Sequence, residues 1–317
     1  MKAFVPGAGL GTRLRPLTDE RPKPLVPIFG KPLITFAFDH LIAHGVTALV
    51  VNTHHRPEAY DSILGASGAS ADYRGYPVTL RNEPLLLDTA GGIKNAGDLL
   101  NDGPFLIHNG DVLADLDLHT LIERHRAEDN IATLALRSGG GPLHIAVDPS
   151  TGLVVDIRRT LNTHPAFQEY LFTGIYLLSP EALDWIEPGV PRHIVPVLLE
   201  MIRRGRRVAG VVLDEGSWSD LGDPRAYVDA HWELIEGRRL SHLKDPAWPQ
   251  PVHPTAVLGP GVRLIGRNAI GPGAVIGDGA CLENCILWPG AKTAPGIHLR
   301  NCIVRAFAAR SANDEIL

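Results

Sequence analysis

The chain has 317 residues, enough for one large domain or two, and its 44% hydrophobic and 21% charged residues are typical of an ordinary globular protein. Thirty basic and 35 acidic side chains give a formal net charge of -5, which argues against a broad nucleic-acid-binding surface but permits a local basic pocket for phosphates. No apolar run is long enough to span a bilayer, the N-terminal apolar stretch is too short for a secretory signal, and the three cysteines lack a paired spacing for zinc. We therefore expect a reduced, cytoplasmic protein that binds neither nucleic acid nor a membrane.

Short β-rich runs alternate with helical stretches up to about residue 237. The pattern predicts strands at 3–5, 47–52, 78–83, 104–109 and 131–137, and helices at 31–44, 92–100, 118–126 and 225–236. This alternation is typical of an α/β fold with a Rossmann-like mixed, mostly parallel sheet flanked by helices. Strands at 144–147, 154–158 and 172–178 follow one another without helices, so we expect them to form an antiparallel element inserted over the main sheet.

A different pattern begins after a polar, proline-containing stretch at 237–250, which is predicted to be a linker. Aliphatic residues then recur every six positions, at Leu258, Leu264, Ile270, Ile276 and Leu282. Such a period predicts a short C-terminal left-handed β-helix of hexapeptide repeats, in which each aliphatic side chain fills the interior. The expected organisation is a first domain at 1–236, the linker, the β-helix at 251–310 and a tail at 311–317, with homo-oligomers formed through the β-helix.

The strongest motif directly follows the first strand and reads GAGLGTRLRPLT at 7–18, with RPKPLVP at 21–27. Glycines at this place let backbone N–H groups approach an anion closely. A dinucleotide fingerprint would need glycine where Thr12 stands, and a Walker loop would need a Gly-Lys pair. Two cations bracket the loop instead, Arg13 and Lys23, which suits a triphosphate whose pyrophosphate leaves with its charge neutralised.

With these residues the sequence resembles the sugar nucleotidyltransferase family, the NDP-sugar pyrophosphorylases. The family signature is GxGTRLxPLT followed by PKPLxP, and this chain carries both halves. The resemblance covers nearly the whole length, and within the family the chain looks most like mannose-1-phosphate guanylyltransferases. It implies an enzyme in which a sugar 1-phosphate oxygen attacks the α-phosphorus of a nucleoside triphosphate, releasing pyrophosphate without a protein nucleophile.

Two aspartates are expected to hold Mg²⁺. Asp111 follows the strand at 104–109, at the sheet edge where ligands of α/β proteins usually bind. Asp220 lies in a segment that resembles the family's W-x-D-x-G, and in the family both aspartates bind a magnesium ion that bridges the phosphates. Carboxylate oxygens with partial hydration are what magnesium prefers.

The resemblance also implies the other roles. Arg13 would neutralise the departing phosphates, and Lys23 would contact the phosphates near the reacting centre. The expected nucleotide-binding residues are Ala8, Gly9, Gly11, Thr12, Glu83, Thr89, Ala90, Gly91, Gly92 and Asn109, and the expected sugar-binding residues are Arg158, Thr173 and Gly174. The chain lacks the E-K-P segment of many members; Arg158 and Arg159 stand at its place, and either arginine could supply the missing cation.

Two alternatives remain open, and a third is disfavoured. Uridylyl- or thymidylyltransferases acting on another hexose, heptose or amino sugar 1-phosphate share much of the signature. A catalytically silent subunit that senses nucleotide sugars would have the same fold, although it would be expected to have lost Arg13, Lys23 or a metal aspartate. An acyl-transferring β-helix is disfavoured because no recognisable acyl-transfer site surrounds His253 or His298.

Overall fold

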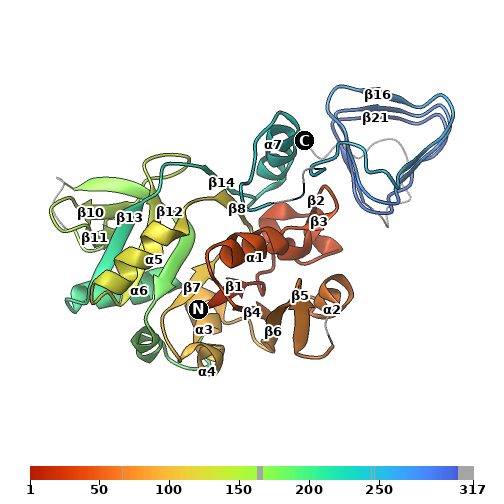
Figure 1. The fold of residues 1–317 in the computed structure, drawn as a ribbon. Helices are drawn as coiled ribbons and strands as arrows, with labels where there is room; N and C mark the ends of the chain where they lie inside the picture. The colour runs from red at the N-terminus through yellow and green to blue at the C-terminus, as the bar shows by residue number, and fades with distance from the viewer. Residues whose placement is uncertain (66, 163–166, 244, 246, 306–317) are drawn as a thin grey trace. The chain divides into compact units, whose positions relative to one another are not determined.

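The computed structural model describes residues 1–65, 67–162, 167–243, 245 and 247–305 (Figure 1). By its internal contacts the chain divides into two compact units, each of which is assembled from separate segments. The first unit comprises Met1–Leu10, Pro22–Pro24 and Ile34–Ser219, and the second comprises Gly11–Arg21, Leu25–Leu33 and the chain from Asp220 onward. The predicted tail at 311–317 lies outside the described residues.

A mixed ten-stranded sheet forms the first unit, in the order β10-β11-β13-β9-β12-β7-β1-β4-β6-β5. Its strands are β1 (Lys2–Pro6), β4 (Ala48–Thr53), β5 (Ser70–Tyr73), β6 (Tyr76–Asn82), β7 (Phe105–His108), β9 (Ala132–Arg137), β10 (Ile145–Asp148), β11 (Leu153–Ile157), β12 (Gln168–Leu178) and β13 (Val208–Val212). A separate pair joins β8 (Val112–Asp115) to β14 (Ser217–Asp220). The helices are α1 (Ile34–Ala43), α2 (Glu58–Leu64), α3 (Asp88–Asn95), α4 (Gly97–Leu100), α5 (Leu118–Ala127) and α6 (Ile194–Arg203), with 3-10 turns η3 (Lys23–Leu25) and η4 (Pro180–Trp185).

The central strands are apolar almost throughout because both faces of the sheet are covered. Phe105, Leu106 and Ile107 of β7 are at most 1% exposed, as are Phe4 and Val5 of β1. Among the described strands of this sheet, parallel pairing is limited to β7-β1-β4-β6 and to β13-β9. The prediction of a mostly parallel sheet therefore holds for these two groups and is wrong for the sheet as a whole.

The strands predicted as an inserted element belong to the main sheet instead. The strands β10 and β11 pair with each other in antiparallel fashion, and β12 lies antiparallel between β7 and β9. A tight turn joins β10 to β11, and such a connection permits only antiparallel pairing. The helix-free segments thus belong to the ten-stranded sheet, in which β10 also pairs with the first residues of β12.

The second unit contains the start of the chain segment predicted as the helix 31–44. There β2 (Pro27–Ile28) and β3 (Lys31–Pro32) form a hairpin, with Phe29 at φ 47° and Gly30 at φ 81° between them. Two consecutive residues with positive φ are the requirement of a type I′ hairpin turn. The proline therefore ends a strand and does not open a helix, and α1 begins only at Ile34.

The rest of the second unit contains η1 (Thr12–Leu14), η2 (Leu17–Asp19), α7 (Pro224–Ile235) and short C-terminal strands. These are β15 (Val257–Leu258), β16 (Arg263–Ile265), β17 (Ala269–Ile270), β18 (Val275–Ile276), β19 (Cys281–Glu283), β20 (Ile286–Leu287), β21 (His298–Arg300) and β22 (Ile303–Val304). They form three small parallel sheets, β15-β18, β16-β19-β21 and β17-β20-β22 (blue in Figure 1).

Side chains of the six-residue repeat are not all interior. Ile270, Ile276 and Leu282 are at most 2% exposed, whereas Leu258 is 39% and Leu264 37% exposed. The expectation that all five fill an interior is thus wrong for Leu258 and Leu264. Among the described helices, none is both long and apolar enough to cross a membrane.

Candidate active site

The carboxyl ends of four parallel strands bring several predicted residues to one edge of the sheet. Because β1, β4, β6 and β7 run in the same direction, the residues that end or follow them lie at a common edge. Gly7 follows β1, Asn52 lies near the end of β4, Glu83 follows β6 and Asn109 follows β7. Ligands of open α/β sheets bind at such an edge.

Both backbone polar groups of Gly7 are held by side chains that the sequence analysis missed. The amide of Gly7 donates to Asn52 Oδ1 (2.8 Å), and its carbonyl accepts from the Tyr60 hydroxyl (2.8 Å). A Cβ on Gly7 would lie 2.6 Å from the Asn52 carbonyl oxygen, so only glycine fits. Asn52 could have been found as a polar residue near the end of an apolar strand, whereas Tyr60 carries no sequence signal. Nothing lies within 4 Å of a Cβ built on Gly9, so the loop is open there.

Glu83 is buried and fully engaged by protein groups. Its Oε1 accepts from Asn52 Nδ2 (2.7 Å) and its Oε2 accepts from the Leu87 amide (3.1 Å). Desolvation by burial raises the pKa of the Glu83 carboxyl above its usual range, while the bond from Asn52 opposes this shift. Glu83 therefore connects the loop after β1 to the segment that leads into α3.

Residues 89–92, which are expected to bind the nucleotide, form the first part of helix α3. The amides of Ala90 and Gly91 donate to the carbonyl of Arg192 (2.8 and 3.2 Å). Gly92 packs against the Asn52–Glu83 pair, since an added Cβ would lie 2.5 Å from Asn52 Nδ2 and 2.8 Å from Glu83 Oε1. The helix can thus approach the sheet edge closely only with glycine at this position.

Lys23 and Asp111, predicted for separate roles, form an ion pair in the first unit. Lys23 Nζ lies 2.5 Å from Asp111 Oδ2, with the lysine side chain 9% and the aspartate side chain 28% exposed. The neighbouring Gly110 is tightly packed, because a Cβ there would lie 2.7 Å from the Pro6 carbonyl oxygen. A partly exposed carboxylate at the sheet edge is the kind of oxygen ligand that a hydrated Mg²⁺ uses, so Asp111 fits that ion.

Asn109 and Gly174 are neighbours through the pairing of β7 with β12. Gly174 has φ 77°, and a Cβ there would lie 2.5 Å from Asn109 Nδ2. The pairing of β12 with β9 shifts register between Phe172 and Tyr176, so Gly174 lies within a bulge. The structure thereby joins a residue predicted for the nucleotide to one predicted for the sugar.

Thr173 is bound by protein groups in the same bulge. Its hydroxyl donates to the Ala135 carbonyl (2.8 Å) and accepts from the Ile175 amide (3.2 Å), and its carbonyl accepts from Trp218 Nε1 (2.9 Å). The side chain is 1% exposed. Thr173 therefore shapes the bulge through its own hydrogen bonds.

The two arginines at the place of the missing E-K-P segment differ in their partners. Arg159 Nε donates to Glu169 Oε1 (2.8 Å), which neutralises its charge locally. Arg158 is exposed and has φ 56°. Arg159 is exposed as well, so the two differ in that the Arg159 guanidinium is engaged by the Glu169 carboxylate.

The remaining predicted residues belong to the second unit. Gly11 has φ 62° and precedes η1, which contains Thr12 and Arg13, both exposed. Arg13 lies against Gly222, because a Cβ on that glycine would be 3.0 Å from Arg13 Nη1. Asp220, two residues earlier, is exposed. The unit therefore brings Arg13 beside the segment of the second predicted metal ligand, whose carboxylate also suits Mg²⁺.

Comparisons with known proteins identify the family to which the chain belongs. Residues 2–237 match the family model described as nucleotidyl transferase. The chain is 30% identical to a mannose-1-phosphate guanylyltransferase of Mycobacterium tuberculosis over 91% of this chain and 80% of that one. It is 27% identical to a UTP–glucose-1-phosphate uridylyltransferase of Synechocystis over 91% of this chain and 83% of that one.

A solved structure from Bacillus anthracis, provisionally described as a glucose-1-phosphate thymidylyltransferase, matches the fold. Its TM-score is 0.62 at 20% sequence identity, with 74% of this chain and 94% of that chain covered. The chain belongs to the nucleotidyl transferase family, and its relatives define it more closely as a sugar-1-phosphate nucleotidyltransferase. The resemblance stated from the sequence is thereby confirmed.

Proposed function

We propose that the protein joins mannose 1-phosphate to GTP, forming GDP-mannose and pyrophosphate. The sugar phosphate oxygen attacks the α-phosphorus, the bond from that phosphorus to the bridging oxygen breaks, and pyrophosphate leaves. The observation that carries the proposal is the Lys23–Asp111 ion pair at the sheet edge, where Gly110 packs against the Pro6 carbonyl just before the glycine loop. A guanylyltransferase is favoured because several mannose-1-phosphate guanylyltransferases are 30–34% identical to this chain.

Catalysis on this site would rest on position and charge. Lys23 would approach the phosphates at the reacting centre, and Arg13 would neutralise the β- and γ-phosphates as they depart. Asp111 and Asp220 would hold Mg²⁺, which supplies charge neutralisation between the phosphates when bound. No protein nucleophile is required, since the sugar phosphate is already ionised.

Binding of the nucleotide would use backbone at the sheet edge. The loop at Ala8, Gly9, Gly11 and Thr12 would cradle the phosphates with its amides. Glu83 would act indirectly, by holding Asn52 and the segment before α3, because both its oxygens are already bonded. The base would lie against Thr89 to Gly92 and Asn109.

The sugar would lie by the bulge of β12. Because Gly174 has no Cβ, the Asn109 side chain can pack against it, and the hydrogen bonds of Thr173 stabilise the bulge. Arg158 would supply the cation for the sugar phosphate, since Arg159 is paired with Glu169.

We further propose the domain organisation expected from the sequence: a catalytic domain at 1–236, a linker at 237–250 and a left-handed β-helix from 251. Parallel partners 17 or 18 residues apart in three small sheets support a three-sided coil. Exposed apolar side chains at its first turn, Val257, Leu258, Leu264 and Ile265, favour homo-oligomers formed through this end. Ile265→Asp should then lower the mass measured by light scattering, while Val212→Asp, an exposed apolar position on β13, should not; an unchanged mass in Ile265→Asp contradicts the idea.

Pyrophosphate release tests the activity. GTP, UTP, dTTP, ATP and CTP are crossed with a panel of sugar 1-phosphates in the presence of Mg²⁺. We expect GTP with mannose 1-phosphate to be fastest. If a pair with UTP or dTTP reacts faster, the proposed substrates are wrong, whereas the assignment as a sugar-1-phosphate nucleotidyltransferase remains. If no pair releases pyrophosphate but calorimetry detects nucleotide binding, the result would favour the nucleotide-sugar-sensing subunit.

A further inference from the structure

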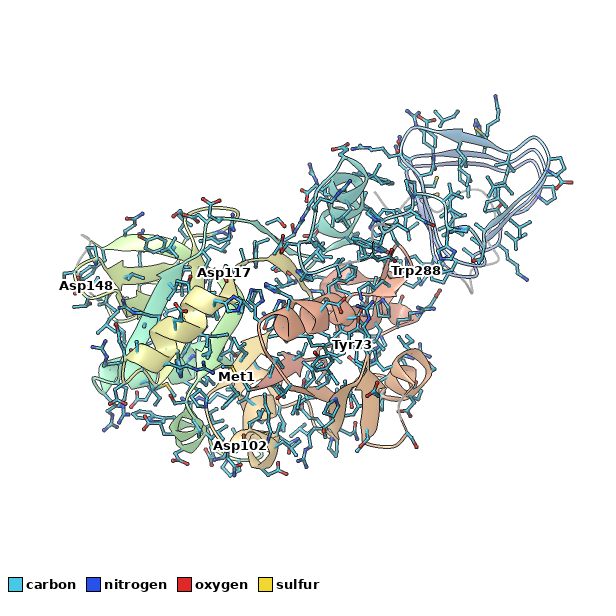
Figure 2. The ribbon with its side chains drawn as sticks, viewed as in Figure 1. Met1, Tyr73, Asp102, Asp117, Asp148 and Trp288 are labelled. Carbon is cyan, nitrogen blue, oxygen red and sulfur yellow. The ribbon has the colours of Figure 1, made fainter. Side chains whose placement is uncertain are left out.

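Three side chains with metal-binding atoms meet where α1 ends and α5 begins. His44 directly follows α1, Asp117 is the N-cap of α5, and His119 lies in the first turn of α5 (Asp117 is labelled in Figure 2). One ligand atom from each of the three lies within 4.8 Å of the others, and no other trio of His, Cys, Asp or Glu within the described part of the chain does so. None of the three belongs to the proposed active site.

His44 faces the Asp117 carboxylate with its Nε2, the ring nitrogen that carries no hydrogen in the neutral side chain. Its Nδ1 lies 2.8 Å from the His40 carbonyl, which only accepts, so Nδ1 carries the hydrogen and Nε2 carries the lone pair. A backbone carbonyl on the second ring nitrogen is also the arrangement that orients histidine ligands of metals.

Asp117 faces that lone pair as an anion. The His119 amide donates to Asp117 Oδ1 (3.0 Å). His44 Nε2 lies 3.6 Å from the same oxygen. Two acceptors therefore face each other at a separation too long for a hydrogen bond, an arrangement that a cation between them would stabilise.

The separations match the edges of a small coordination sphere. Bonds of about 2.0–2.2 Å to Zn²⁺ put neighbouring ligand atoms roughly 2.9–3.6 Å apart. His44 Nε2 lies 3.6 Å from Asp117 Oδ1, and His119 Nδ1, which donates a hydrogen bond to the same oxygen in this structure, lies 3.0 Å from it. His119 can free Nδ1 without a change of charge, because the hydrogen of a neutral imidazole can move to the other ring nitrogen.

We propose that His44, Asp117 and His119 bind a divalent transition-metal ion of the Zn²⁺ type. Two imidazoles and one carboxylate suit Zn²⁺, Co²⁺ or Ni²⁺, whereas Mg²⁺ prefers oxygen ligands alone. The Asp117 and His119 side chains are 62% and 64% exposed, so water completes the coordination. The ion links the end of α1 to the start of α5 and is separate from the proposed catalytic metal.

Metal uptake by the full-length, metal-free protein tests the site. The protein is titrated with Co²⁺ in excess Mg²⁺ and followed by visible absorption, and Zn²⁺ is measured by equilibrium dialysis. We expect one tightly bound ion per chain. Asp117→Asn retains a good N-cap but removes the anionic ligand, so it should weaken binding at least about tenfold, as should His119→Ala.

Two control variants distinguish Co²⁺ binding at this site from Co²⁺ binding elsewhere on the protein. His298→Ala removes an exposed imidazole on β21, and Asp111→Asn alters the proposed catalytic metal site; both should bind Co²⁺ as the parent does. Zn²⁺ should also raise the melting temperature of the parent and not that of Asp117→Asn. Equal Co²⁺ affinity in the parent and Asp117→Asn, or an equal loss in His298→Ala, would overturn the proposal.

Discussion

Lys23 Nζ lies 2.5 Å from Asp111 Oδ2, although the two residues are 88 positions apart in the chain. The pair is largely withdrawn from water, with the lysine side chain 9% exposed. A cation and an anion that both suit polyphosphate chemistry are therefore held together before substrate arrives. Loss of either residue leaves the other without this partner.

Asp111→Asn should keep the fold and lose most Mg²⁺-dependent turnover, because an amide is a poor ligand for Mg²⁺ beside phosphates. Pyrophosphate release at saturating substrates measures the effect, and circular dichroism checks the fold. Near-normal turnover would remove Asp111 from the metal site.

Lys23→Ala should lower kcat by about 10²–10³-fold, since it removes a fixed cation from the reacting centre. Lys2→Ala is a matched control, because Lys2 also pairs with an aspartate, Asp102 at 2.8 Å, away from the sheet edge. Lys2→Ala should leave kcat unchanged. A Lys23→Ala enzyme with parental kcat would exclude the proposed role.

Gly92→Ala should destabilise the protein by about 1–3 kcal/mol and raise the KM for nucleotide, because the new methyl group would overlap Asn52 and Glu83. Gly9→Ala meets no atom within 4 Å and should leave the free energy of unfolding unchanged, yet raise the same KM if the nucleotide approaches this backbone. Urea unfolding and steady-state kinetics separate the two effects. Equal stabilities of the two variants would contradict the packing argument.

Arg305→Ala should weaken nucleotide binding, although Arg305 lies far along the chain from the glycine loop. Arg305 Nη1 donates to the Pro16 carbonyl (2.7 Å) and lies 3.1 Å from Glu20 Oε1, so it anchors the segment that contains Arg13. We expect a higher KM for nucleotide together with a loss of stability, because the Arg305 side chain is 7% exposed and its removal leaves the Glu20 carboxylate without this partner. The control Arg300→Ala removes an exposed arginine paired with Glu283 and should not change KM. Identical kinetics in both variants would rule out the anchoring role.

Stability should fall as the solution is acidified from pH 6.5 toward pH 4. Burial lowers the pKa of His231 from 6.5 to about 4, so between these values the unfolded chain binds a proton that the folded chain does not. This residue's contribution, up to about 3 kcal/mol, is complete above pH 6.5 and is lost as the pH falls through 4. Urea midpoints at several pH values measure the slope, which should be smaller in His231→Gln; an unchanged slope would contradict the assignment.

Much of the chemistry could be predicted from the sequence because it is carried by local patterns. The run at 7–18 with PKPLVP required no tertiary information, since glycines and two cations near one strand end already suggest phosphate binding. Apolar runs such as Phe105–Ile107 likewise predicted buried strands. Strand direction was harder, because hydrophobic periodicity does not state which strand lies beside which.

Tertiary structure alone decided which of these residues meet. Asn52 and Tyr60 bind the backbone of Gly7 from 45 and 53 positions away in the chain. The Glu83 carboxylate accepts a hydrogen bond from the Asn52 side chain. The pairing of Lys23 with Asp111 depends on where β7 lies in the sheet. A sequence pattern records which chemical groups a segment offers, whereas hydrogen-bond partners, burial and charge neutralisation depend on distances that are set only when distant segments pack together.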